Sequence, residues 1–139
     1  MTDSHITTVQ DLYGAFGRGD VETILEALAD DVDWAAEAAE PSAPWQGVRH
    51  GKAEVASFFQ ELAGSMEVTE FTPLTYASNG DDVLVVIDYG VTSRVNGKSA
   101  RMQLHHWWRF RDGKVCYWRG TEDTAATAEL LAPQAVPAG

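Results

Sequence analysis

The second half of the chain consists of long runs of alternating side chains separated by short turn sequences. The dipeptide Asn96-Gly97 stands between two of these runs, and a two-residue type I′ turn needs positive φ at both positions, which Asn and Gly tolerate. The sequence therefore predicts antiparallel hairpins in which Val95 pairs with Lys98. The four extended segments expected on this basis are residues 67–78, 83–95, 98–110 and 114–121.

The pairing of Val95 with Lys98 decides which side chains share a face of the sheet, because directly opposed residues point to the same side. His105, Trp107 and Arg109 then lie on a mixed, polar outer face. On the inner face, His106 lies opposite Ile87 and is the one strongly polar group of that set. The expected inner face is Val83, Val85, Ile87, Tyr89, Val91, Met102, Leu104, His106, Trp108 and Phe110.

The next turn contains Asp112-Gly113 and leaves two registers open. A three-residue loop with Gly113 in the left-handed region would pair Phe110 with Lys114. This favoured register places Cys116, Trp118, Gly120 and Glu122 on the inner face. A two-residue loop would reverse the last strand, and Asp123 would then point inward in place of Glu122.

The first half of the chain predicts three helices and one short strand. Ser4 can cap a helix with an apolar stripe that ends at Phe16, and Asp20 can cap a second helix. Residues 52–63 carry apolar side chains at the spacing of a third helix, whereas residues 31–36 read as a short strand. Two prolines predict an irregular loop between them.

Length and charge narrow the classes of protein to which the chain can belong. With 139 residues it fits one domain, expected over residues 1–132 with a flexible tail at 133–139. A net charge of −11 argues against a nucleic-acid partner. No basic segment followed by an apolar run opens the chain, and no stretch is long and apolar enough for a membrane span, so a soluble cytoplasmic protein is expected. The lone Cys116 excludes an internal disulfide and is expected to be a small buried hydrophobe.

Three segments resemble the nuclear transport factor 2-like superfamily, which includes ketosteroid isomerases, limonene epoxide hydrolases and SnoaL-type polyketide cyclases. These segments are AFGRGDVETILEALADDVDW, WQGVRHGKAEVASFF and HHWWRFRDGKVCYWRGTEDTAA. The resemblance implies a cone-shaped, cystatin-like α+β domain with three N-terminal helices packed on a curved antiparallel sheet around a central pocket. It also implies a homodimer formed through the outer face of the sheet, for which Trp107 is a candidate contact.

The resemblance carries over only part of each family mechanism. His106 matches the pocket histidine of the polyketide cyclases, but Gly120 stands where the cyclases and epoxide hydrolases have a catalytic aspartate. The base of the ketosteroid isomerases corresponds to Ala36 or Glu37, and Tyr13 lies one position away from their oxyanion-binding tyrosine. Fold alone does not fix function, so the activity has to be argued from the site.

His106 is the first candidate catalytic residue, with Glu122 or Asp123 as its partner in proton transfer. A histidine satisfied by a core neighbour is the alternative for His106, and capping of residues 124–131 is the alternative for Asp123. The candidate ligand pocket is Tyr13, Trp34, Tyr89, Trp108, Trp118 and Gly120.

These candidates predict a small-molecule protein of the SnoaL-like type. It would bind an apolar polyketide- or steroid-like ligand and act as an isomerase or cyclase by acid/base chemistry, without a cofactor. A metal is not expected, because His105 and His106 point to opposite faces. The alternative is a non-catalytic ligand-binding or dimerisation module on the same fold, and a hydrolase that activates water is a weaker third.

Overall fold

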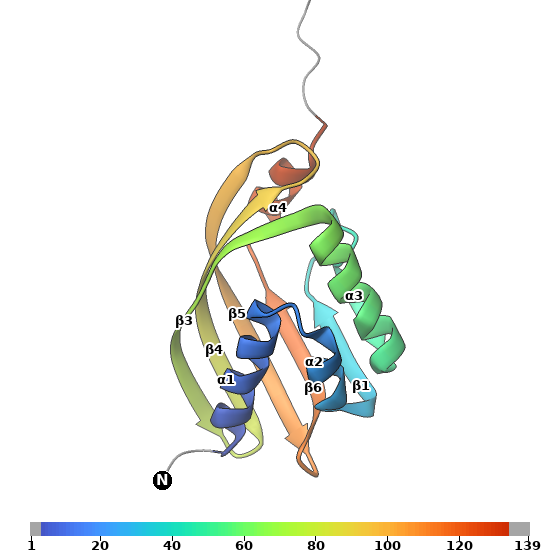
Figure 1. Cartoon of the computed structure of the whole chain (residues 1–139), viewed down its shortest axis with the longest axis vertical. Helices are drawn as coiled ribbons and strands as arrows, with labels where there is room; N and C mark the ends of the chain where they lie inside the picture. Colours follow the sequence, from blue (N-terminus) through green and yellow to red (C-terminus); the bar gives the residue numbers. More distant parts are fainter. Residues whose placement is uncertain (1–3, 134–139) are drawn as a thin grey trace, which may run out of the picture.

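One curved six-stranded sheet with helices against it forms the computed structural model of the chain, which describes residues 4–133 (Figure 1). This architecture is the expected α+β class, with three helices in the N-terminal half and a fourth after the last strand. The predicted tail at 133–139 lies, except for Pro133, outside the described residues. The elements are α1 (Ser4–Gly17), α2 (Val21–Glu26), β1 (Leu28–Ala36), β2 (Gly47–His50), α3 (Gly51–Ser65), β3 (Met66–Asn79), β4 (Asp82–Ser93), β5 (Ser99–Arg111), β6 (Lys114–Thr121) and α4 (Thr124–Leu131).

The sheet is mixed, with strand order β2-β1-β6-β5-β4-β3. β3 to β6 form the expected antiparallel run, but β1 pairs in parallel with β6, so the prediction of a wholly antiparallel sheet is wrong at that pair. The interpretation of residues 37–51 as loop is also wrong at β2, which pairs with β1. The pairings of β1 with β6 and with β2 join strands that are separated in the sequence, and no local pattern of side chains predicts them.

The hairpin between β4 and β5 differs from the predicted register by two residues. Val85, not Ile87, lies opposite His106, and residues 94–97 form a four-residue loop in which only Gly97 has positive φ, at 73°. Contacts outside the hairpin hold this wider loop, since Arg94 donates to Ala63 O and Asn96 to Ala132 O. A shift of two residues leaves every side chain on its predicted face, because the strand period is two.

The turn between β5 and β6 has two loop residues, which is the less favoured of the two registers predicted from the sequence. Asp112 (φ 51°) and Gly113 (φ 77°) both have positive φ, as a type I′ turn requires. The reversal of faces does not follow, because a bulge one residue further restores the alternation. Val115 is fully buried opposite Phe110, whereas Cys116 sits at the bulge and is partly exposed, so its predicted inner position is wrong.

Helices α1, α2 and α3 lie against the concave side of the sheet and supply the other half of the core (Figure 1). Asp20 caps α2 as predicted, with its carboxylate accepting from Thr23 N at 3.2 Å. Between the helices and the sheet lie large aromatic side chains, and this layer contains the cavity described below. Over residues 4–133, no helix combines the length and apolar character that crossing a membrane requires.

Candidate ligand-binding site

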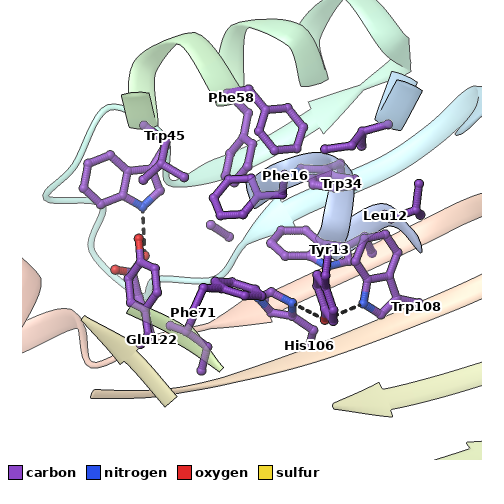
Figure 2. A pocket seen from close by; sticks show the side chains of 18 of the residues that line it. Leu12, Tyr13, Phe16, Trp34, Trp45, Phe58, Phe71, His106, Trp108 and Glu122 are labelled. Atoms are coloured by element: carbon purple, nitrogen blue, oxygen red, sulfur yellow. Dashed lines mark hydrogen bonds between the residues drawn. The ribbon is translucent and has the colours of Figure 1, made fainter. Parts of the chain in front are cut away.

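A central cavity lies between the helices and the inner face of the sheet (Figure 2). The cavity opens to solvent, and its wall is almost entirely apolar and aromatic. All six predicted pocket residues line it, together with His106 and Glu122, but Asp123 does not. The lining is Leu12, Tyr13, Phe16, Ile24, Trp34, Ala36, Trp45, Phe58, Phe59, Leu62, Phe71, Tyr89, Leu104, His106, Trp108, Trp118, Gly120, Thr121 and Glu122.

The hydroxyl of Tyr13 connects two side chains of β5. Trp108 Nε1 donates to this hydroxyl at 3.0 Å, and the hydroxyl lies 2.8 Å from His106 Nδ1. An indole can only donate, so the phenol oxygen accepts from Trp108. Donation of the phenol proton to His106 Nδ1 is the arrangement that gives this proton a partner among the described residues. Burial raises the pKa of Tyr13 far above its ordinary value, so the phenol retains that proton to donate.

We assign the tautomer of His106 from this arrangement. Because Nδ1 accepts from Tyr13, the proton of the neutral ring is on Nε2, and no described residue forms a hydrogen bond with Nε2. Burial among aromatic rings, with a smaller effect of His105, lowers the pKa of His106 to about 3, which keeps the ring neutral. His106 therefore presents one N–H donor and is a poor base near neutral pH.

Glu122 belongs to a second network at another part of the cavity (Figure 2). Its Oε1 accepts from Trp45 Nε1 at 2.9 Å and from Gln46 Nε2 at 3.4 Å, and its Oε2 accepts from Thr127 Oγ1 at 2.5 Å. Burial, together with the charge of Glu122, raises the pKa of Tyr89 above its ordinary value. Glu122 thus joins the loop before β2 to α4, and both of its oxygens are already bonded.

The remaining carboxylate candidates are occupied elsewhere. Asp123 caps α4, accepting from Ala126 N at 3.0 Å, which is the alternative that the sequence left open. Ala36, at the position of the isomerase base, lines the cavity without a polar group, and Glu37 forms an ion pair with Arg119 at 3.3 Å. Among residues 4–133, no carboxylate forms a hydrogen bond with His106.

Gly120 stands where related enzymes have a catalytic aspartate, but here the position lies under an aromatic ring. A Cβ at Gly120 would lie 2.4 Å from Cη2 and 2.7 Å from Cζ2 of Trp118, so the indole of Trp118 occupies the space that a side chain would take. That indole stacks on Trp34 with 4.2 Å between ring centroids. Both indole N–H groups are buried and lack a hydrogen-bond partner. The missing side chain at Gly120 therefore makes room for the ring of Trp118.

His105 is exposed on the outer face of β5, opposite in direction to His106, as the alternation predicted. Within residues 4–133, no three His, Cys, Asp or Glu side chains are grouped so that they could hold a metal ion. Several lining residues, notably Trp45, Phe58 and Phe71, were not predicted from the sequence. The apolar spacing of α3 marked Phe58 as buried, but the irregular loop gave no signal for Trp45.

Fold and site together define an α+β pocket protein whose cavity lies between helices and a sheet and is lined by aromatic rings. The model of the SnoaL-like domain matches residues 9–118, and the chain therefore belongs to the SnoaL-like family. A search of proteins with curated functions found no match.

Solved structures of similar proteins agree with this family. An NTF2-like protein of unknown function from Burkholderia pseudomallei K96243 is 30% identical, with a TM-score of 0.87 over 94% of this chain and 99% of that one. An NTF2-like protein from Burkholderia thailandensis E264 is 27% identical, with a TM-score of 0.83 over 96% and 100%. TerC, co-crystallised with polyporic acid, is 26% identical, with a TM-score of 0.80 over 93% and 98%.

Proposed function

We propose that the protein binds a flat, largely apolar small molecule in the central cavity and that His106 Nε2–H donates a hydrogen bond to an acceptor on it. The observation that carries this proposal is the chain from Trp108 through Tyr13 to His106, which leaves one neutral N–H donor within an aromatic wall. Pockets of this kind bind rings through apolar area and orient them through a few polar groups.

Binding is favoured over acid/base catalysis by the state of the two candidate groups. The acceptor nitrogen of His106 is taken by Tyr13, and both oxygens of Glu122 accept hydrogen bonds in a separate network. A general base needs a free lone pair within reach of the proton that it removes. Acid/base catalysis by His106 with Glu122 or Asp123, which the sequence favoured, is therefore the second candidate function after ligand binding.

One observation favours that second candidate, an isomerase or cyclase acting on a ketone. A neutral imidazole N–H in an apolar cavity can polarise a carbonyl and stabilise the enolate that forms when a water molecule removes the α-proton. Exchange of the α-protons of a bound ketone with D₂O, followed by NMR, would test this directly. Exchange that depends on His106 would support catalysis, and binding without exchange would support a binding protein.

The binding proposal can be tested with polyporic acid, an aryl-substituted dihydroxyquinone, because a relative of similar length was crystallised with it. Calorimetry and tryptophan fluorescence would follow the titration, since Trp34, Trp108 and Trp118 line the cavity. We expect His106→Ala to weaken binding by roughly three- to tenfold, the value of one hydrogen bond. His105→Ala changes the neighbouring, exposed histidine and should leave binding unchanged. Absence of binding to the wild type would contradict the proposal.

We also propose that the protein is a cytoplasmic homodimer formed through the outer face of the sheet. Trp107 packs edge-to-face on Tyr117 there, and Leu84, its cross-strand neighbour, is 50% exposed. Exposed apolar side chains beside aromatic ones are common in protein interfaces. Light scattering of the wild type and of Leu84→Lys would test this: a monomeric wild type contradicts it, and a dimer that Leu84→Lys dissociates supports it.

A further inference from the structure

A second hollow lies beside the central cavity, where the α1–α2 turn faces the junction at which β3 continues from α3 (Figure 1). It is open to solvent and mostly apolar, and we call it the side groove. Five residues line both hollows, among them Phe16 and Phe71, so these side chains form a wall shared by the two. Val21, Met66 and Val68 line the side groove alone.

Several apolar side chains of the side groove are only partly buried. Phe16, Val68 and Phe71 pack against the core and keep part of their surface toward solvent. Leu62 of α3 and Val21 of α2 are in the same state, so four elements contribute to one apolar surface. Apolar side chains gathered in an open hollow indicate a place where a bound molecule covers them.

A β-bulge in β3 shapes the edge of the side groove. The register with β4 shifts between Val68 and Glu70, so Thr69 is the extra residue, and it lines the groove. Glu70 forms an ion pair with Arg101 of β5 across Gly90, where no side chain stands between them. This carboxylate, which belongs to the lining of the groove, is therefore already neutralised.

Arg94 supplies the positive charge of the side groove. Its Nε donates to Ala63 O at 2.9 Å and its backbone N–H donates to Ser65 O at 2.9 Å, which holds the residue against the end of α3. Within residues 4–133, Arg94 forms no ion pair and its two terminal nitrogens have no hydrogen-bond partner. A guanidinium with both terminal nitrogens free can hold the two oxygens of a carboxylate.

We propose that the side groove binds an acyl-chain carboxylate, with the chain on the apolar wall and the carboxylate on Arg94. The apolar lining reaches from the α1–α2 turn to the α3–β3 junction, and Arg94 is held at that junction, so both parts of such a molecule meet a matching surface. One guanidinium neutralises one charge, whereas the net charge of −11 disfavours a dianion such as a phosphate monoester. This site is separate from the central cavity and does not use His106.

Decanoate and 1-decanol test the site, because they share a chain and differ in the charged end. We expect the wild type to bind decanoate roughly threefold more tightly than decanol, the value of one solvent-exposed ion pair. High salt should reduce this preference. Without a local cation, the net charge of −11 would favour the alcohol, so the sign of the preference is itself informative.

NMR locates the bound chain. In protein labelled with ¹³C at the methionine methyl groups, decanoate should shift the signal of Met66, which lines the side groove, and not that of Met102, which lines neither hollow. The indole N–H signals of Trp34 and Trp118 report on the central cavity and should not move. A ligand of the central cavity would shift the indole signals instead, so failure of one site does not decide the other.

Substitutions then assign the charge. Arg94→Gln should abolish the preference for decanoate, whereas Arg94→Lys keeps the charge without the contact to Ala63 and should retain most of it. Lys98→Gln is the matched control, because it removes one positive charge from an exposed position near Arg94 in sequence but outside the side groove. It should leave the preference unchanged.

Four results would each overturn the proposal. One is absence of decanoate binding to the wild type, and another is equal binding of decanoate and decanol. A third is movement of the indole signals with an unchanged Met66 signal, which would place the chain in the central cavity. The fourth is an equal effect of Arg94→Gln and Lys98→Gln, which would reduce the preference to net charge. The wild-type measurements decide the matter even if Arg94→Gln does not fold.

Discussion

Mild acid should destabilise the protein through His106. Its pKa is lowered by burial to about 3 in the folded state, whereas an unfolded histidine titrates near 6.5. Between these values the unfolded chain binds a proton that the folded protein does not. The contribution of this group to stability is therefore complete above pH 6.5 and is lost as the pH falls toward 3.

The magnitude follows from the same two pKa values. Between pH 7.5 and 5.5, protonation of one histidine in the unfolded state alone removes about 1.4 kcal/mol from the free energy of unfolding. This window lies above the range in which ordinary carboxylates titrate, so most of the other groups change little.

Urea unfolding at both pH values measures this loss in the wild type, in His106→Gln and in the control His105→Gln. We expect the decrease in stability to be about 1.4 kcal/mol smaller in His106→Gln than in the wild type, because only the wild type takes up this proton on unfolding. His105 is exposed on the opposite face, so His105→Gln should follow the wild type. Equal pH dependence in the wild type and His106→Gln would mean that the folded ring binds the proton, which would refute the neutral donor.

Three further substitutions test the packing and hydrogen bonds around the cavity. Gly120→Ala should destabilise by about 1–3 kcal/mol and shift the fluorescence of Trp118, since a Cβ would overlap that ring, whereas Gly64→Ala on open helix surface should be neutral or stabilising by thermal unfolding. Glu122→Gln should cost about 1–3 kcal/mol in urea, because one amide cannot accept from donors on both sides, and an unchanged midpoint would count against the network. Asp123→Ala should cost about 1 kcal/mol through loss of the α4 cap, and calorimetry showing no loss would exclude that role.

The alternation of side chains predicted the inner face of the sheet although neither hairpin register was predicted correctly. Between β4 and β5 the error was a shift of two residues, which leaves each side chain on its face. Between β5 and β6 a bulge compensated the shorter turn, so Trp118 also remained on the expected face. Asn96-Gly97 did not form the predicted turn because residues of its loop bond to Ala63 and Ala132, far away in the sequence. Tertiary contacts outweighed local turn preference at that site.

The composition of the site was predictable, but its chemistry was not. An apolar face with one histidine and several tryptophans follows from the pattern of β4 to β6. The sequence could not show that Tyr13 occupies one nitrogen of His106, because the two residues meet only through packing of α1 on β5. Nor could it show that the ring of Trp118 fills the space above Gly120, which depends on one rotamer of that side chain.

The parallel contact of β1 with β6 has a consequence for the order of folding. Strands β3 to β6 are joined by short turns, whereas β1 reaches β6 across most of the chain, and the ion pair of Asp33 with Arg119 joins residues 86 positions apart. Local hairpins close faster than such long-range pairs, so β1 is expected to dock last. Until it docks, β6 is an unpaired edge strand, and such edges promote aggregation. Substitutions that slow the docking of β1 should therefore lower the yield of folded protein without altering the cavity of the molecules that complete folding.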